Sequence, residues 1–372
     1  MKKIKENSIT FILIPLIILI TIIDIFNKDI SFSNYENRSL AMKPKFYYSD
    51  LKSGRFFKNY ERYINDQFLL RNRWINLKSI SENLLGKKEN NGIIYGKNHY
   101  LFDKFEKLDE NNLYKNINTL KSFINNSNSK FNIMIIPESF TIYKEYLPYG
   151  VDLVDEENYI NNINLIFDEL ENTTSIDIVN TFKNSKDQYI YYKTDHHWTS
   201  LGAYLAYKEF AIVNNIAPIE ITDLRENRVD GFLGTYFSKS KKINAKEDYI
   251  LYYDNLNIDV KIDGVKVSGL NNDDKWESSD KYSAFLNGNN GLTVIKNNSI
   301  KNNSKILVIK DSYANSFIQF LINNYNEIYV VDLRSYSTGF NNFFKENRFN
   351  NVLIMYSLKN LSEDVNLSKL KY

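Results

Sequence analysis

Hydrophobic positions follow helical spacing in the first part of the chain. Between Leu51 and Phe68, and again over residues 72–85, apolar residues recur every three or four positions. This spacing places them on one face of a helix, and Gly86 is suited to end the second helix. Farther on, two short apolar runs flank a polar turn at residues 96–99, which predicts a hairpin.

Downstream of this hairpin, nearly continuous apolar runs alternate with helical patterns. Runs of this kind suit parallel strands that are buried on both faces. The expected strands cover residues 131–137, 175–180, 188–192, 305–311, 327–333 and 351–357. The alternation predicts an α/β fold, a doubly wound and mostly parallel sheet with helices on both faces. The turn-rich residues 225–300 predict a small antiparallel insertion.

The N-terminus predicts a membrane anchor. Lys2, Lys3 and Lys5 precede an uncharged stretch that extends to Ile23, and apolar positions continue to Phe26. About 20 apolar residues span the hydrocarbon core, and a basic flank stays cytoplasmic. A cleavable signal peptide is the alternative, but no small-residue cleavage site follows the apolar stretch.

The expected organisation follows from this anchor. A cytoplasmic tail covers residues 1–6, a transmembrane signal anchor 7–26, a connector 27–50, and an extracellular domain 51–372. The chain is therefore expected in the cell membrane as a single-pass protein with its main domain outside.

Composition excludes several kinds of function. The 47 basic and 45 acidic residues give a net charge of +2, so no surplus of positive charge indicates a nucleic-acid partner. The chain has no cysteine, which excludes disulfides, thiol catalysis and cysteine-rich zinc sites. No cofactor is expected.

Candidate chemistry lies at the carboxyl ends of the predicted strands, where open α/β sheets bind ligands. At one such end the chain reads VIKDSYANSF, which places Ser312 between a strand and a helix. A serine in this position can act as an exposed nucleophile, because the helix N-terminus stabilises a developing oxyanion. The alternative is that Ser312 only caps the helix.

Only three histidines are available as a base for such a serine. His99 falls in the predicted hairpin turn, whereas His196 and His197 follow Asp195 in TDHHWT. Asp195 and His197 are two positions apart, so one loop can bring carboxylate and imidazole into contact. A metal site is the rival interpretation. A catalytic zinc needs three protein ligands, and the sequence identifies no third, so no metal is expected.

Two further strand ends carry candidate substrate contacts. Arg334 follows the apolar run EIYVVDL and can hold a substrate carboxylate or a sugar hydroxyl, or can pair with Asp332. Tyr356 lies at the end of NVLIMYS and is expected to line the same crevice.

Several blocks together resemble the bacterial DHHW family, which is related to the SGNH-hydrolase-like domains of the alginate O-acetylation proteins. The principal blocks are TDHHWT, KDSYANS and VDLRSY. Further blocks are ENRSLAMKP, DQFLLR, NGIIYGKNHYLF, IIPESFTIYKEYLP and GFLGTYFSKS. Their order covers nearly the whole chain past the predicted anchor. The resemblance implies an SGNH-hydrolase-like fold.

The resemblance also implies a catalytic triad. In the acetylation proteins the triad is Asp-x-His followed by a later serine, which carries over to Asp195, His197 and Ser312. One departure is that Lys310 precedes Asp311 where the usual signature has glycine.

Other residues receive secondary roles from the resemblance. It implies that His196, Trp198 and Asp311 support the triad, with Trp198 packed under the loop. Asn315 is a candidate for the oxyanion hole and for substrate binding, together with Arg334 and Tyr356.

The expected function is that of a membrane-anchored, extracytoplasmic serine acyltransferase or esterase acting on acetyl groups of a cell-surface polysaccharide. The related systems imply a membrane-bound partner that supplies acyl groups. The alternative is a catalytically silent protein that binds or organises cell-wall glycan, because a fold does not by itself give a function.

Overall fold

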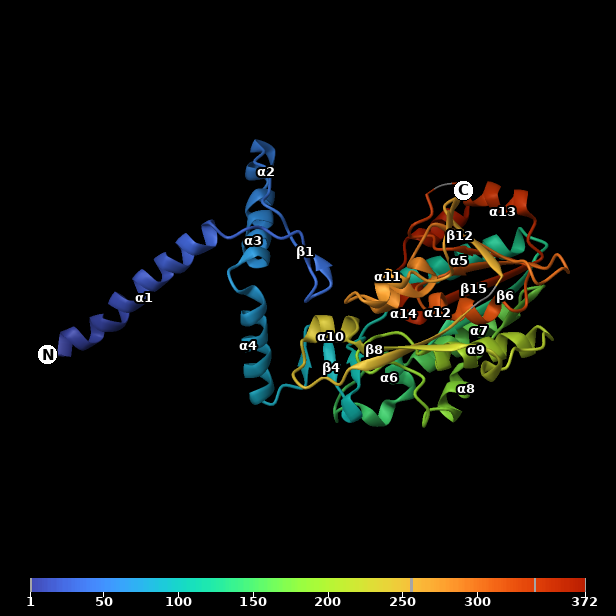
Figure 1. The fold of residues 1–372 in the computed structure, drawn as a ribbon, viewed down its shortest axis with the longest axis horizontal. Helices are drawn as coiled ribbons and strands as arrows, with labels where there is room; N and C mark the ends of the chain where they lie inside the picture. The colour runs from blue at the N-terminus through green and yellow to red at the C-terminus, as the bar shows by residue number, and fades with distance from the viewer. Residues whose placement is uncertain (1, 255–256, 338, 372) are drawn as a thin grey trace. The chain divides into compact units, whose positions relative to one another are not determined.

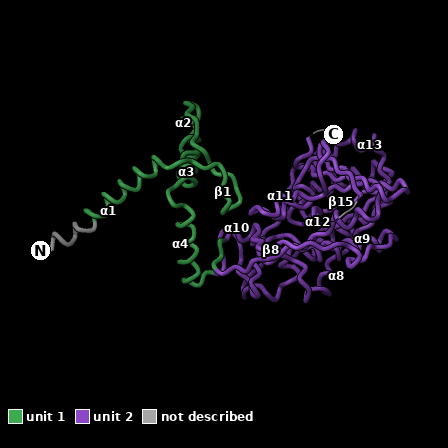
Figure 2. Tube along the Cα trace, viewed as in Figure 1, with its two compact units in different colours: residues 1–87, 241–243 green, residues 88–240, 244–372 purple. Residues whose placement is uncertain are grey.

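The computed structural model describes residues 2–254, 257–337 and 339–371, and it describes residues 2–9 by their backbone alone. The chain divides into two compact units, which Figure 2 shows in separate colours. The first unit covers residues 1–87 and 241–243, and the second covers residues 88–240 and 244–372. Figure 1 labels the helices and strands.

The smaller unit is mostly helical. Its elements are α1 (Lys2–Ile25), β1 (Phe32–Ser33), β2 (Arg38–Ser39), α2 (Tyr48–Lys52), α3 (Arg55–Gln67) and α4 (Arg71–Leu84). The helical patterns over residues 51–68 and 72–85 are thereby confirmed, except that Gly54, with φ of 75°, separates α2 from α3. Gly86 follows α4 with φ of 74°, a left-handed conformation that favours glycine.

Polar side chains at the end of α3 hold the preceding segment. Gln67 donates from Nε2 to the carbonyls of Ile30 and Ala41, both at 2.9 Å, and its Oε1 accepts from the Ile30 N–H at 3.0 Å. Asp66 makes a two-point ion pair with Arg38 at 2.5 and 3.0 Å. These contacts bring together the sequence blocks around Arg38 and Asp66.

No helix among the described residues is both long enough and apolar enough to cross a membrane. The anchor predicted over residues 7–26 has no support from this finding. The predicted tail, residues 1–6, lies outside the residues whose side chains are described.

The larger unit is built on an eight-stranded sheet (Figure 1). In spatial order its strands are β11 (Val265–Val267), β10 (Ile258–Ile262), β12 (Leu292–Asn297), β14 (Glu327–Val331), β13 (Lys305–Lys310), β15 (Asn351–Ser357), β6 (Lys130–Ile136) and β7 (Thr173–Ser175). Strands from β14 to β7 pair in parallel, whereas β11, β10 and β12 add an antiparallel edge. This is a mixed α/β fold with a large, mostly parallel sheet.

Helices and two smaller sheets complete this unit. The helices are α5 (Glu110–Asn125), α6 (Ser139–Ile142), α7 (Glu156–Asp168), α8 (Val179–Asn184), α9 (Ser200–Val213), α10 (Thr235–Ser240), α11 (Asp273–Trp276), α12 (Ala314–Leu321), α13 (Phe340–Asn347) and α14 (Leu358–Glu363). The small sheets are β3 (Glu89–Asn90) with β4 (Ile93–Tyr95) and β5 (Leu101–Asp103), and β8 (Glu226–Phe232) with β9 (Asp248–Tyr253). The hairpin around residues 96–99 is confirmed by the antiparallel pairing of β4 with β5.

The central strands are buried on both faces. In β15 every residue from 352 to 357 is buried, and in β13 every residue from 306 to 310 is buried. Side chains of a strand point alternately to the two faces, so both faces must be covered. The continuous apolar runs in the sequence reflect this double burial.

The parallel register aligns the carboxyl ends of four strands. Lys310 pairs with Met355, Ile309 with Val331, and Ser357 with Ile136. The residues that follow β13, β14, β15 and β6 therefore meet along one edge of the sheet, as expected for a ligand-binding edge.

The strand predicted over residues 175–180 is wrong. Strand β7 ends at Ser175, and Asp177 accepts a hydrogen bond from the Val179 N–H at 2.9 Å as α8 begins. Ile176 and Ile178 are buried, which produced the alternating pattern, but they belong to a connection.

The strand predicted over residues 188–192 is also wrong. This segment makes only an isolated bridge between Tyr191 and Trp198. It folds back on the chain that follows it: the Tyr192 N–H donates to the His197 carbonyl at 3.2 Å, and the Thr199 N–H donates to the Ile190 carbonyl at 2.9 Å. Residues 190–199 thus form a closed loop.

The predicted insertion over residues 225–300 is antiparallel, but it is not a separate piece. Strand β12 pairs with β14, placing Leu292 opposite Val331, and so the antiparallel strands extend the main sheet. Among the strands that the structure describes in this insertion, only β8 and β9 form a sheet of their own.

Candidate active site

Ser312 lies in the turn between β13 and α12, at the carboxyl edge of the sheet. The preceding Asp311 is fully buried and fixes this turn. Its carboxylate accepts hydrogen bonds from the Tyr313 N–H at 3.0 Å, the Ser357 N–H at 2.8 Å and Asn360 Nδ2 at 2.7 Å. One buried carboxylate therefore ties the Ser312 turn to the end of β15 and to α14.

The closed loop of residues 190–199 carries the two histidines. Asp248, at the start of β9, is buried and accepts from the N–H groups of Lys193 and Thr194 at 2.9 and 2.8 Å. It also accepts from the Thr194 hydroxyl at 2.5 Å and from the Tyr189 hydroxyl. These contacts fix the backbone immediately before Asp195.

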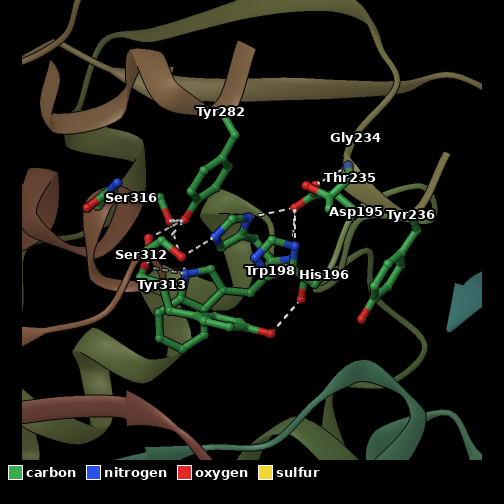
Figure 3. Close-up of polar contacts among 12 residues, drawn as sticks. Asp195, His196, Trp198, Gly234, Thr235, Tyr236, Tyr282, Ser312, Tyr313 and Ser316 are labelled. Atoms are coloured by element: carbon green, nitrogen blue, oxygen red, sulfur yellow. Dashed lines mark hydrogen bonds and ion pairs between the residues drawn. The ribbon is translucent and has the colours of Figure 1, made fainter. Parts of the chain in front are cut away.

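Asp195, His197 and Ser312 form a continuous line of hydrogen bonds (Figure 3). His197 Nδ1 lies 2.6 Å from Asp195 Oδ1, and His197 Nε2 lies 2.8 Å from Ser312 Oγ. The His197 N–H donates to the same Asp195 oxygen at 3.0 Å. The structure thus brings together the three residues predicted as acid, base and nucleophile.

The Asp195 carboxylate is stabilised in its charged form. Burial alone would raise its pKa, but the imidazoles of His196 and His197, the hydrogen bond from His197 and the Thr235 N–H at 2.7 Å lower the pKa below its usual range. An ionised Asp195 accepts a hydrogen bond from His197 Nδ1–H, so the proton of the neutral ring is on Nδ1. His197 Nε2 is then free to accept a hydrogen bond from the Ser312 hydroxyl.

Gly234 allows a second segment to approach Asp195. A Cβ atom at Gly234 would lie 2.3 Å from Asp195 Cβ and 2.4 Å from Asp195 Oδ2. The absence of a side chain therefore lets the Thr235 N–H reach the carboxylate. Gly234 lies in GFLGTYFSKS, a block that the sequence singled out without a role for this glycine.

Tyr282 covers one face of the His197 ring. The ring centroids are 3.6 Å apart and the planes differ by 9°. The Tyr282 hydroxyl donates to the Ser312 carbonyl at 3.2 Å and lies 3.1 Å from Ser316 Oγ. Tyr282 comes from the antiparallel insertion, and no sequence pattern pointed to it.

Trp198 and His196 lie beside the line from Asp195 through His197 to Ser312 and are not part of it. Trp198 is fully buried, and its Nε1 donates to the Tyr313 carbonyl and to Ser316 Oγ, both at 3.0 Å. The Tyr313 hydroxyl donates to the His196 carbonyl at 2.5 Å. The His196 side chain is 27% exposed, and its Nδ1 lies 3.6 Å from Asp195. Trp198 thus packs under the loop, against the helix that follows Ser312.

Asp195, His196 and His197 also place possible metal-ligand atoms within 4.8 Å of one another. Both ring nitrogens of His197 are already engaged, one by Asp195 and one by Ser312. A metal ion at this cluster would have to displace one of these contacts. The geometry therefore favours His197 as a hydrogen-bonding base.

Arg334 pairs with Asp332, one of the alternatives that the sequence left open. Its Nε and Nη2 donate to the two carboxylate oxygens at 2.9 and 2.6 Å. Asp332 is also 3.4 Å from the buried Lys310 Nζ. Asn315 accepts from Lys310 Nζ at 2.7 Å and donates from Nδ2 to Asn289 Oδ1 at 3.1 Å, so its side-chain amide is engaged away from Ser312.

Tyr356 is fully buried at the end of β15. It lines a cavity of about 230 Å³ together with Asp311 and Arg334. Arg334 and Tyr356 therefore line one cavity beside the Ser312 turn.

Two buried acidic residues, Glu138 and Glu156, lie next to each other near the site. Glu156 accepts from the Glu138 N–H at 2.8 Å and from the Thr141 hydroxyl at 2.6 Å, and Glu138 accepts from the Tyr236 hydroxyl at 3.1 Å. Burial raises the pKa of Glu156 to about 7, against the lowering effect of these two hydrogen bonds. Burial, and then the charge of Glu156, raises the pKa of Glu138 well above its usual range.

Comparison with known proteins assigns the chain to a family. The family model "DHHW protein" matches residues 93–331, which is more than half of the chain. The chain therefore belongs to the DHHW family. A comparison with curated proteins finds no match.

Solved structures share the fold. A DHHW family protein from Eubacterium siraeum is 24% identical with a TM-score of 0.66, over 76% of this chain and 96% of that one. PatB1 of Bacillus cereus, solved with a sulfonyl adduct, is 22% identical with a TM-score of 0.61, over 75% and 98%. The O-acetyltransferase domain of Pseudomonas putida AlgJ is 14% identical with a TM-score of 0.51, over 75% and 98%.

We expect Gly234→Ala to destabilise the larger unit by about 1–3 kcal/mol, because the added methyl group overlaps Asp195. Gly269→Ala is the matched control, since a Cβ there meets nothing within 4 Å. Urea unfolding of the full-length variants measures the difference. Equal midpoints for the two variants would show that the loop can retreat from Asp195 without cost.

A second expectation concerns Glu156→Gln and pH. The pKa of Glu156 is about 7 in the folded chain and about 4.3 in an unfolded one. The folded state holds the extra proton between these values, so the associated stability is complete below about pH 4.3 and is lost as the pH rises through 7. Glutamine keeps one acceptor oxygen and cannot ionise. The stability of Glu156→Gln relative to the unchanged chain should therefore increase from pH 5 to pH 8.

Urea unfolding at several pH values provides the measurement, with Glu157→Gln on the same helix as the control. Between about pH 4.3 and pH 7 the advantage of Glu156→Gln should grow by about 1.4 kcal/mol per pH unit, and above pH 7 it should stay constant. An advantage that does not change with pH would contradict a raised pKa for Glu156.

Proposed function

We propose that this chain is an extracytoplasmic serine acyltransferase or esterase of the SGNH-like type, acting on acetyl groups of a cell-surface polysaccharide. The observation that supports the proposal most directly is the line from Asp195 Oδ1 through His197 to Ser312 Oγ, with contacts of 2.6 and 2.8 Å. This arrangement has the mutual geometry of an acid, a base and a nucleophile.

In the first half of the reaction Ser312 attacks the carbonyl carbon of an acetyl ester. His197 Nε2 takes the proton from Ser312 Oγ as the new C–O bond forms, and Asp195 stabilises the resulting imidazolium. His197 then returns this proton to the oxygen of the departing alcohol as the original ester bond breaks. The product is an acetyl-serine and a free alcohol.

In the second half the acetyl group leaves Ser312. A sugar hydroxyl gives its proton to His197 Nε2 and attacks the acetyl-serine, and His197 protonates Ser312 Oγ as that bond breaks. Transfer to a sugar and hydrolysis by water differ only in the attacking oxygen. Ser312 is partly buried and His197 is 5% exposed, which limits the access of water to this step.

The related structures support the class of reaction. The AlgJ domain is an O-acetyltransferase, and PatB1 was solved with a sulfonyl adduct. Their likeness to this chain is one of fold. The reaction assigned to this chain therefore depends on its own Asp195, His197 and Ser312.

The proposed location depends on the N-terminal sequence alone. Three lysines precede an uncharged apolar stretch, which favours an anchor with the main domain outside the cell. A polysaccharide substrate and a membrane-bound partner that supplies acyl groups belong to the same proposal.

The rate of p-nitrophenyl acetate hydrolysis by the full-length chain tests the triad. Ser312→Ala and His197→Ala should each lower kcat by roughly 10³-fold or more. The first removes the oxygen that bonds to the acyl carbon, and the second removes the base that transfers the proton. Asp195→Asn should lower kcat by roughly 10²- to 10⁴-fold, because an amide does not stabilise the imidazolium. His99→Asn is the matched control, since His99 lies in the hairpin turn with φ of 68°, which asparagine tolerates.

Equal rates in all these variants would remove the enzyme proposal and favour a silent glycan-binding protein. A stoichiometric metal ion on the purified chain would contradict the role of His197 as a free base. Phenylmethylsulfonyl fluoride should modify Ser312 in the unchanged chain and not in His197→Ala, as mass spectrometry of the labelled peptide would show.

Cell fractionation tests the location. The full-length chain should sediment with membranes and resist extraction with alkaline carbonate, because an uncleaved apolar helix remains in the bilayer. A chain whose first 26 residues are replaced by a cleavable signal peptide should appear in the medium. Release of the full-length chain by carbonate would contradict anchoring.

A further inference from the structure

The cavity beside the Ser312 turn carries polar groups that the chain itself does not satisfy. Its volume is about 230 Å³, and Asp311, Arg334, Tyr356 and Asp364 are among the residues that line it. Asp311 immediately precedes Ser312, so the cavity adjoins the turn that presents the proposed nucleophile.

Tyr356 and Asp364 each contribute a buried atom without a hydrogen-bond partner among the described residues. These atoms are the Tyr356 hydroxyl and Asp364 Oδ2. Tyr356 is 0% exposed and Asp364 is 9% exposed. A buried polar group without a partner costs about 1–3 kcal/mol, so native structures rarely retain one unless a ligand or water satisfies it.

The two groups are held firmly in place. The other Asp364 oxygen, Oδ1, accepts from the N–H and Nδ2 of Asn366 at 2.7 and 2.9 Å. The Asp364 carbonyl accepts from the buried Asn116 Nδ2 at 2.7 Å. Tyr356 lies in a central strand that is buried on both faces. Neither group can therefore turn to another partner without disturbing the fold.

The volume of the cavity is too large for a single bridging water to fill. A water molecule occupies about 30 Å³ in the liquid, so the cavity has room for several waters or for a larger polar molecule. Burial raises the pKa of Tyr356 well above its usual range, and so its hydroxyl remains a donor. One donor and one acceptor among the residues that line a small cavity match a molecule that both donates and accepts, such as an alcohol with several hydroxyl groups.

The charge of the cavity limits what it can hold. Three carboxylates line it, those of Asp311, Glu363 and Asp364, and Arg334 supplies the positive charge. The Arg334 guanidinium is already engaged by Asp332 through two hydrogen bonds. A negatively charged ligand would therefore meet uncompensated like charge, which opposes its binding.

We propose that this cavity is the sugar subsite of the reaction and that it takes an uncharged hydroxyl-bearing sugar, with Tyr356 donating to one sugar oxygen and Asp364 accepting from a sugar hydroxyl. Uronic acids are excluded by the carboxylates around it. The inference rests on the proposed function, because it assigns the cavity to the substrate of Ser312. It narrows the substrate to a polysaccharide whose acetylated unit carries no carboxylate.

Calorimetric titration of the full-length chain tests the inference, with cellotetraose as the neutral probe and tetragalacturonic acid as the charged one. The unchanged chain should bind cellotetraose at least roughly 10-fold more tightly than tetragalacturonic acid. Tyr356→Phe should weaken cellotetraose binding roughly 3- to 10-fold, because one hydrogen bond is lost. It should not lower thermal stability, since the hydroxyl has no partner in the free chain.

A gain of binding gives a sharper test than a loss. The double variant Glu363→Gln with Asp364→Asn removes two of the three carboxylates, and it should bind tetragalacturonic acid more tightly than the unchanged chain does. For Tyr356→Phe the matched control is Tyr325→Phe, because Tyr325 is a buried tyrosine that does not line the cavity.

Three results would overturn the inference. They are equal binding of the two probes, no saturable binding of cellotetraose, and unchanged cellotetraose binding in Tyr356→Phe. The last result would mean that the cavity holds water only. No acyl donor is present in these titrations, so they remain informative even if the ester-hydrolysis experiments rule out catalysis.

Discussion

The site depends on the hydrogen bonds that the buried carboxylate of Asp195 accepts. This carboxylate accepts the backbone and ring N–H groups of His197 from its own loop and the Thr235 N–H from a segment forty positions later. A buried charge is stable only when such donors surround it, so the loss of one donor destabilises the charged carboxylate and weakens its remaining contacts. Gly234 permits this convergence because it leaves room at the carboxylate. The orientation of the imidazole toward Ser312 follows from these contacts.

The sequence predicted the central sheet because its strands are buried on both faces. Strands β6, β13, β14 and β15 appear as continuous apolar runs, and these runs occur where the structure has strands. The strand predictions over residues 175–180 and 188–192 were wrong for a common reason. The apolar side chains of both segments are buried, but their backbones bond within a connection or to the following residues, and side-chain composition does not reveal backbone partners.

Asp195, His197 and Ser312 were candidates because histidine is scarce here and the serine follows a strand end, and the resemblance to the DHHW family selected them as a triad. His197 and Ser312 are 115 positions apart, and they come into contact because both of their loops lie at the same edge of the sheet. Tyr282 could not be predicted, since it reaches the site from the turn-rich insertion. The partner of Arg334 was open in the sequence, and the structure supplies it in Asp332. Local spacing identifies groups with suitable chemistry, whereas the shape of a cavity and its unsatisfied atoms arise only from tertiary packing.

The Tyr282 ring has a consequence for the order of events in the proposed cycle. It lies 3.6 Å from the His197 ring and is tethered through its hydroxyl near Ser312, so the imidazole cannot rotate without displacing it. A proton collected at Nε2 must then be delivered from Nε2, at the same point in space. The departing alcohol and the incoming one therefore compete for a single position beside Ser312. Such an enzyme releases its first product before it admits the acceptor, and a high concentration of either alcohol should slow it.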